Sequence, residues 1–289
     1  MPARVPDLLA PGPTRIMGIV NVTPDSFSDG GRWLDPREAV RRGRELAAAG
    51  ADIIDIGGES TRPGSTRPDA DEELARVLPV VEALVADGLV VSVDTMRAEV
   101  ARETLAAGAT FVNDVSGGQA DPAMPELVAR TGAPFILMHW RGLLTDPHEK
   151  PHYGDVTAEV CGELTERVDA LLGAGVAREQ IILDPGFGFS KDEGHNWTLL
   201  SRLDRVMALG LPVLVGTSRK RFLGRLPARP GVTVAPDAAP TEPVDRDVAT
   251  AATSLLAAQA GAWAVRVHDV AATREALGVW QMVRGADAR

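Results

Sequence analysis

Residues 16–20 read Ile-Met-Gly-Ile-Val, and residues 21–31 read Asn-Val-Thr-Pro-Asp-Ser-Phe-Ser-Asp-Gly-Gly. The first stretch is an apolar run with the length of a buried strand. The second has no apolar period and is rich in Pro, Asp, Ser and Gly, which is typical of a loop. Because this loop also carries an amide, carboxylates, hydroxyls and an aromatic ring, it offers more chemistry than a simple connection needs. We therefore predict a strand followed by a functional loop.

The same unit recurs along the 289 residues, since short apolar runs alternate with longer amphipathic stretches. The predicted strands are 16–20, 53–56, 90–93, 111–114, 135–138, 181–183, 213–215 and 264–267. The predicted helices are 36–49, 72–86, 98–107, 122–130, 156–173, 196–208, 247–260 and 272–283. Strands that are almost entirely apolar are typical of a parallel sheet covered on both faces. Eight such units predict an α/β fold, a (β/α)8 TIM barrel in a single domain.

We place the barrel at residues 15–289, after an N-terminal extension of residues 1–14. A doubly wound open sheet is the alternative, but neither glycine-rich phosphate motif of that class, G-x-G-x-x-G or G-x-x-x-x-G-K-[ST], occurs in the sequence. Residues 225–245 are rich in proline and have no apolar period, so we expect a mobile loop there.

Composition narrows the functional class. The net charge is −10 and there is no basic tail, which argues against nucleic-acid binding. A single cysteine, Cys161, cannot form an internal disulfide and fits a reducing compartment. No run of eighteen apolar residues occurs, and the first residues lack the apolar segment of a signal peptide. We expect a cytoplasmic protein that does not bind a membrane.

Polar residues follow the predicted strands, where the active site of a (β/α)8 barrel lies. Asp94, Asn113 and Asp184 stand at the carboxyl ends of three different strands, so two carboxylates and an amide surround the predicted barrel mouth. Their acceptors and donors suit the amino-pyrimidinone edge of a pterin or a purine, and Lys220 adds a positive charge.

A second group of residues is cationic or can donate protons and suits a phosphate or diphosphate. It consists of Arg62, Arg219, Arg266 and His268. Asn21 offers an amide oxygen for Mg²⁺, a hard ion that is commonly shared with substrate phosphates. Two roles are open for Glu59: it is a catalytic group, or it holds the second loop in place.

From about Arg15 to Val283 the chain resembles the dihydropteroate synthase family. Residues 21–31 resemble the family's first loop, 57–64 (Gly-Gly-Glu-Ser-Thr-Arg-Pro-Gly) its second, and 216–224 (Gly-Thr-Ser-Arg-Lys-Arg-Phe-Leu-Gly) its signature after strand seven. The motifs Ser-Val-Asp-Thr, Asn-Asp-Val-Ser-Gly, Leu-Asp-Pro-Gly-Phe-Gly-Phe and Arg-Val-His-Asp-Val also stand in family order.

The resemblance implies a folate-biosynthesis enzyme that joins p-aminobenzoate to 7,8-dihydropterin-6-ylmethyl diphosphate and releases diphosphate. It implies a role for each matching position. The pterin would be held by Asp94, Asn113, Asp184 and Lys220, p-aminobenzoate by Phe27, Thr61, Pro63 and Ser218, the diphosphate by Arg62, Arg266 and His268, and Mg²⁺ by Asn21. Asp94, Lys220, Arg266 and His268, with Asp29 from the first loop, would be catalytic.

Two other functions stay open at the level of sequence. A methyltetrahydrofolate-binding methyltransferase domain has a similar barrel, but it needs no diphosphate site. A non-catalytic paralogue would usually lose residues of the first loop or of the anion site, and none of these is lost here. The family commonly forms homodimers, and the apolar end of the last helix, residues 276–283, is compatible with a homodimer.

Overall fold

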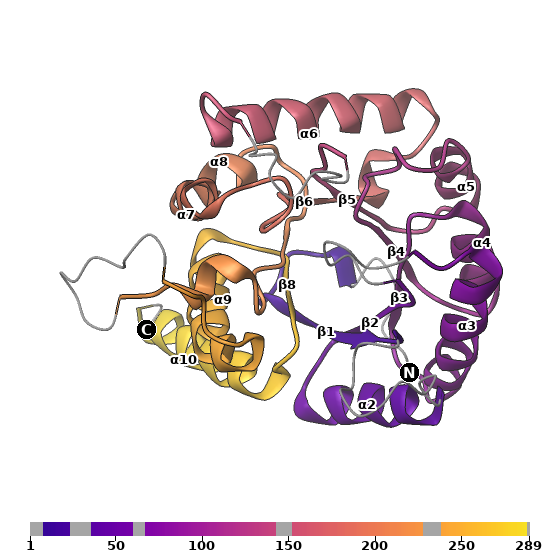
Figure 1. Ribbon diagram of the computed structural model, residues 1–289, viewed down its shortest axis with the longest axis horizontal. Coiled ribbons are helices and arrows are strands. Elements are labelled where there is room, and N and C mark those ends of the chain that lie inside the picture. The colour runs from indigo at the N-terminus through magenta and orange to yellow at the C-terminus, as the bar shows by residue number, and fades with distance from the viewer. Residues whose placement is uncertain (1–7, 24–35, 60–66, 143–151, 228–237, 288–289) are drawn as a thin grey trace.

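The computed structural model describes residues 8–23, 36–59, 67–142, 152–227 and 238–287. Its centre is a parallel sheet of eight strands, surrounded by helices (Figure 1). The strands are β1 Arg15–Asn21, β2 Ile53–Gly57, β3 Val91–Asp94, β4 Phe111–Asp114, β5 Phe135–Met138, β6 Ile181–Asp184, β7 Leu214–Val215 and β8 Ala264–Val267. Their order is β6-β5-β4-β3-β2-β1-β8-β7. The parallel bridge Leu183↔Val213 brings β6 beside β7 and closes the barrel.

Helices connect the successive strands and cover the outside of the barrel (Figure 1). They are α2 Pro36–Ala49, α3 Ala70–Ala86, α4 Ala98–Ala106, α5 Met124–Thr131, α6 Val156–Gly173, α7 Glu193–Ser201, α8 Leu203–Met207, α9 Asp247–Ala260 and α10 Val270–Asp287. Short 3₁₀ helices are η2 Arg178–Gln180, η3 Arg221–Gly224 and η4 Pro243–Arg246. The predicted (β/α)8 barrel is thus confirmed.

Most predicted elements begin or end a few residues away from the observed ones, and three segments differ in a way that bears on the fold. The helix expected at 196–208 is two helices, α7 and α8, because the backbone leaves helical geometry at Arg202 (φ −120°, ψ 32°). The strand expected at 213–215 is shortened to Leu214–Val215, and Val213 is joined to β6 by an isolated bridge. The 3₁₀ helix η4 begins at Pro243, inside the segment 225–245, and its sequence did not predict it, while residues 228–237 lie outside the described part.

Alternation along the strands divides the barrel interior into layers, since successive side chains point to opposite faces. The lower layer is apolar and consists of Met17, Ile53, Phe111, Ile136, Ile182, Leu214 and Ala264, with Trp263 and Leu8 beneath them. The indole nitrogen of Trp263 donates to Leu8 O at 2.7 Å, so the end of the N-terminal extension packs against the barrel. Two residues further along several strands, the inward positions become polar.

Register places several of these positions side by side on neighbouring strands. Asn21 is paired with Gly57, Gly57 with Asp94, and Asp94 with Asn113. On the other side of the barrel Met138 is paired with Asp184. The carboxyl ends of the strands therefore surround one polar mouth above an apolar plug. Within the described residues, no helix is both long enough and apolar enough to cross a membrane.

Candidate active site

Arg266 lies at the centre of the polar mouth. It comes from β8, and it donates from Nε to Asp55 Oδ2 and from Nη2 to Asp94 Oδ2, both at 2.6 Å. Asn113 Nδ2 donates to the same Asp55 oxygen at 3.1 Å. One side of the mouth is therefore a connected set of two carboxylates, one guanidinium and one amide.

Asp55 was not among the predicted site residues. It is fully buried, and among the described residues its second oxygen, Oδ1, has no hydrogen-bond partner. The sequence does carry a signal, because Asp55 interrupts the apolar run from Ile53 to Ile56. Asp55 lies in the middle of β2, whereas the predicted site residues lie at or beyond strand ends.

Burial shifts the proton affinities of these groups. It raises the pKa of Asp94 to about 7, and the neighbouring Arg266 guanidinium opposes that shift. It also raises the pKa of Asp184, whose Oδ1 accepts a hydrogen bond from Gly186 N at 2.7 Å. Conversely, burial and the nearby Arg266 lower the pKa of Lys220 to about 8. Charged groups held in low dielectric are common at functional sites.

Lys220 stands on the opposite side of the mouth from β2. Its ammonium lies 3.9 Å from the centroid of the Phe189 ring, within the range of a cation–π contact. Its stem passes over Gly188, where an added Cβ would lie 2.7 Å from Lys220 Cδ. Asp94 and Asp184 both favour the charged form of Lys220 electrostatically. The structure therefore brings the predicted pterin residues Asp94, Asn113, Asp184 and Lys220 to one mouth.

Ser218 and His268 meet beside them. Ser218 Oγ lies 2.9 Å from His268 Nδ1, and it accepts the backbone N–H of His268 at 3.1 Å. When the Ser218 hydroxyl donates to Nδ1, Nε2 carries the proton of a neutral imidazole. His268 can thus donate from Nε2.

Arg219 and Glu59 have other partners. Arg219, which we grouped with the anion-binding cations, donates from Nε and Nη2 to the carboxylate of Asp247 at 2.7 and 2.6 Å. Glu59 pairs with Arg67 and with Arg97. Glu59 is thus engaged where the second loop begins, which favours its structural reading over the catalytic one.

Asn21 closes β1 at the level of Asp94 and is half-buried. Among the described residues, no three His, Cys, Asp or Glu side chains are grouped so that they could hold a metal ion. A single amide oxygen fits Mg²⁺ that takes most of its other ligands from substrate phosphates and water. The predicted residues Phe27, Asp29, Thr61, Arg62 and Pro63 lie outside the described residues.

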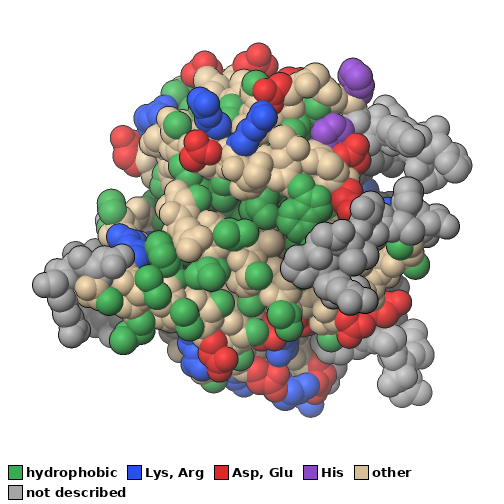
Figure 2. All heavy atoms as spheres, turned by 90° about the vertical axis from the view of Figure 1, so that its left-hand side faces the viewer, with side chains coloured by type: hydrophobic (Ala, Val, Ile, Leu, Met, Phe, Trp, Pro, Cys, Tyr) green, Lys and Arg blue, Asp and Glu red, His purple; other side chains and the backbone are tan. Residues whose placement is uncertain are grey.

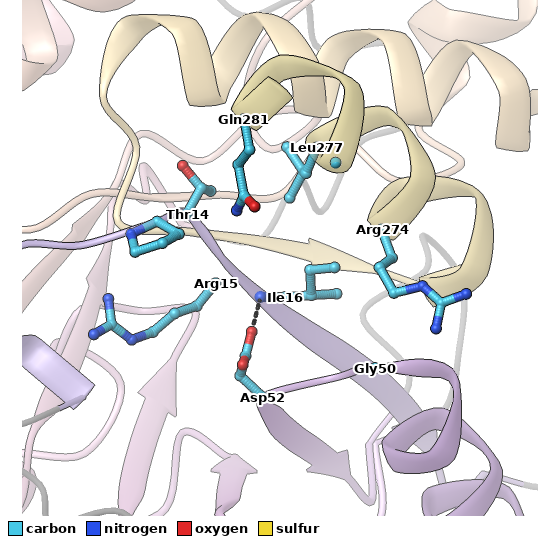
Figure 3. Close-up of a pocket in the computed structure, with 10 residues that line it drawn as sticks. Thr14, Arg15, Ile16, Gly50, Asp52, Arg274, Leu277 and Gln281 are labelled. Carbon is cyan, nitrogen blue, oxygen red and sulfur yellow. Dashed lines mark hydrogen bonds between the residues drawn. The ribbon is translucent and has the colours of Figure 1, made fainter. Parts of the chain in front are cut away.

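A hollow of about 380 Å³ lies at the other end of the barrel (Figure 3). Its walls include Arg15, Asp52 and Arg274, and Asp52 accepts the backbone N–H of Ile16 at 2.8 Å. These residues stand at the amino ends of β1 and β2 and on α10, whereas barrel enzymes act at the carboxyl ends of the strands. This hollow is therefore separate from the polar mouth.

Fold and site together define an enzyme of the pterin-binding (β/α)8 class, and residues 17–268 match the family described as "Pterin binding enzyme". A dihydropteroate synthase of Mycobacterium leprae is 52% identical over 272 residues, which are 93% of this chain and 94% of the relative. The chain therefore belongs to the dihydropteroate synthase family.

Solved structures agree with this assignment. The dihydropteroate synthase of Xanthomonas albilineans with 4-aminobenzoic acid is 48% identical and has a TM-score of 0.84, with 94% of this chain and 93% of that chain covered. The same enzyme in complex with 7,8-dihydropteroate is 46% identical with a TM-score of 0.81, and 94% of each chain is covered.

Proposed function

We propose that this protein is a dihydropteroate synthase, which joins p-aminobenzoate to 7,8-dihydropterin-6-ylmethyl diphosphate to give 7,8-dihydropteroate and diphosphate. The observation that carries the proposal is the polar mouth, where Asp94, Asn113, Asp184 and Lys220 converge above an apolar plug. Likeness to relatives that hold 4-aminobenzoic acid or 7,8-dihydropteroate supports the same chemistry.

The pterin would lie among carboxylates that accept its N–H groups and Lys220, which donates to a ring oxygen or nitrogen. Asn113 can supply an acceptor to the pterin because its Nδ2 already donates to Asp55. Asp94 can accept best when it is ionised, and Arg266 beside it favours that state.

The diphosphate would leave toward Arg266 and His268. Arg266 has five N–H donors, and its bonds to Asp55 and Asp94 leave donors for a phosphate oxygen. In the tautomer in which the Ser218 hydroxyl donates to Nδ1, His268 would donate from Nε2 to the diphosphate. These donors stabilise negative charge as the carbon–oxygen bond breaks. Mg²⁺, held by Asn21 and the diphosphate, would supply further positive charge to the leaving group.

p-Aminobenzoate would attack the methylene carbon with the lone pair of its amine, so the reaction needs no strong base. Since the electron-rich pterin can delocalise a methylene cation, we propose an SN1-like path. Ser218 would lie beside p-aminobenzoate, and the first and second loops would supply Phe27, Asp29, Thr61, Arg62 and Pro63. Asp29 would stabilise the cation.

We also propose that the protein acts as a cytoplasmic homodimer. Exposed apolar side chains gather on η4, α9 and α10, namely Val244, Val248, Leu256, Val279, Met282 and Val283. Figure 2, which faces this side of the barrel, shows hydrophobic side chains spread over the surface. An apolar surface formed by two adjacent helices is typical of a subunit interface. Sedimentation analysis of the protein with Val248→Glu would test it, since a monomer is the expected product.

The direct test is incubation of the purified protein with p-aminobenzoate, the pterin diphosphate and Mg²⁺. We expect 7,8-dihydropteroate and diphosphate in equal amounts, and Asp94→Asn should abolish turnover while the barrel stays folded by circular dichroism. No product from the wild-type protein would favour the non-catalytic paralogue. Methyl transfer from methyltetrahydrofolate, without formation of 7,8-dihydropteroate, would favour the methyltransferase alternative.

A further inference from the structure

Lys191 is a buried lysine that the proposed reaction does not use. It follows β6 by seven residues and is only 8% exposed. Its Nζ lies 3.0 Å from His139 Nδ1, 3.0 Å from Gly186 O and 3.2 Å from Phe189 O. An ammonium has three N–H donors, and here three acceptors surround it.

His139 is set up to accept the Lys191 bond. Burial and the Lys191 charge lower the pKa of His139 to about 3, so its imidazole is neutral. Its Nε2 lies 3.1 Å from Glu163 Oε2, which requires the proton on Nε2 and leaves the Nδ1 lone pair toward Lys191. Arg141 in turn pairs with Glu163. A neutral lysine amine has only two N–H donors, so this arrangement favours the protonated form of Lys191, although burial lowers its pKa to about 7.

The two carbonyls that Lys191 holds belong to residues 186–189, which we call the β6 turn. Gly186 and Gly188 have φ values of 70° and 76°, a left-handed geometry that glycine adopts without strain. The turn is tied at other points too, since Phe189 N donates to Gly186 O and Gly188 N donates to the side chain of Asn196.

The β6 turn touches both groups on its side of the polar mouth. Gly186 N donates to Asp184 Oδ1 at 2.7 Å. The Lys220 stem lies against Gly188, and the Lys220 ammonium lies over the Phe189 ring. The backbone of His139, the third acceptor of Lys191, donates to Asp184 O at 2.8 Å.

We propose that Lys191 is a positioning residue for the pterin substrate: its ammonium holds the β6 turn against β5 and thereby fixes the side chains of Asp184 and Lys220. Lys191 itself touches neither the substrate nor the reacting atoms. The inference rests on the proposed pterin-binding role of Asp184 and Lys220. Because the β6 turn does not contact Ser218 in any described hydrogen bond, binding of p-aminobenzoate should be much less sensitive to Lys191.

The test is Lys191→Met, which keeps the length of the side chain and removes its three donors. Binding of the pterin diphosphate is measured by calorimetry, and KM and kcat are measured for each substrate. We expect the Kd and the KM for the pterin diphosphate to rise at least about tenfold, whereas the KM for p-aminobenzoate changes less than about twofold. Arg205→Met, which removes a cation from the exposed surface of α8, is the matched control and should change neither.

A merely structural role predicts a different result. In that case Lys191→Met lowers the unfolding temperature and the active fraction, so kcat falls while both KM values stay at their wild-type levels. That outcome, or an equal loss for both substrates, overturns the proposal. Lys220→Met separates the two hypotheses: normal pterin binding by this variant refutes the proposed site, whereas a loss with Lys220→Met and none with Lys191→Met refutes only the role of Lys191.

His139 supplies a second pair of variants if Lys191→Met does not fold. His139→Gln keeps an acceptor for the ammonium, and His139→Leu has a similar volume without one. We expect His139→Leu to weaken pterin binding at least about fivefold more than His139→Gln does. Equal Kd values for the pterin diphosphate in these two variants would overturn the proposal.

Discussion

Asp55→Asn tests whether the buried carboxylate in the middle of β2 organises the pterin end of the site. The Asp55 Oδ2 atom accepts from both Arg266 and Asn113, and the amide oxygen of an asparagine can take its place. Two changes remain. Both bonds lose the charge on the acceptor, and the new NH₂ group occupies the buried position of Oδ1, which has no partner among the described residues.

The size of the effect follows from these two changes. The bond from Asn113 falls from the about 1.5–3 kcal/mol of a bond to a charged group to the about 1 kcal/mol of a neutral one, the bond from the charged Arg266 weakens less, and a buried unpaired donor costs about 1–3 kcal/mol. An unpaired acceptor is already present in the wild-type protein, so the second cost is largely offset. We expect a net loss of about 2 kcal/mol, which corresponds to roughly a 30-fold lower kcat/KM for the pterin diphosphate.

The assay is steady-state turnover with the pterin diphosphate varied and p-aminobenzoate saturating, together with thermal unfolding. Asp52→Asn is the matched control, because Asp52 precedes the same strand at the opposite end of the barrel and accepts only the backbone N–H of Ile16 among the bonds described. Its kcat/KM should stay within about twofold of wild type. Wild-type kcat/KM in Asp55→Asn, or the same loss in Asp52→Asn, would refute the reasoning.

Three further predictions follow from the mouth of the barrel. Because Asp94 has a pKa raised to about 7 and must be ionised to accept pterin N–H groups, affinity for the pterin should fall about tenfold per pH unit as the pH drops below 7; a flat calorimetric profile from pH 5.5 to 8 would contradict this. Gly188→Ala should raise the Kd for the pterin at least about fivefold because the new methyl group displaces Lys220, whereas Gly210→Ala has the same left-handed strain (φ 73°) with open space around its Cβ and should leave the Kd unchanged. Asn21→Ala should raise the Mg²⁺ concentration that gives half-maximal binding of the pterin diphosphate by roughly tenfold, measured by calorimetry, and unaltered Mg²⁺ dependence would exclude Asn21 as a ligand.

The sequence predicts most of the fold because buried parallel strands are nearly continuous apolar runs, which periodicity detects. Glycines mark the ends of helices. Gly50, Gly108 and Gly210 all have the left-handed conformation expected of a glycine that follows a helix. The break at Arg202 escaped prediction because the apolar pattern continues through it, with Leu199 and Leu203 both buried. A local backbone change of this kind depends on tertiary packing.

The site residues also divide into those that a sequence pattern predicts and those that only tertiary packing brings together. The sequence predicts Asp94, Asn113 and Asp184 because each lies at or next to the last residue of a strand, and strand ends in a parallel barrel share one mouth. Asp55 accepts a hydrogen bond from Asn113, but its position inside a nearly apolar strand, and not at its end, gives no comparable signal in the sequence. Lys191 had no signal at all, because only the folded β6 turn brings it to His139.

The shortest pairing in the barrel joins β6 to β7, which are linked through one isolated bridge, Leu183↔Val213, that includes the hydrogen bond from Leu183 N to Pro212 O at 2.8 Å. Asp184 follows directly on one side of this seam, and Lys220 follows β7 on the other. A pterin that contacts both residues would therefore link β6 to β7, which share few backbone hydrogen bonds. Substrate binding would stabilise this strand pair against local opening, so amide hydrogen exchange in β6 and β7 would slow when the pterin binds.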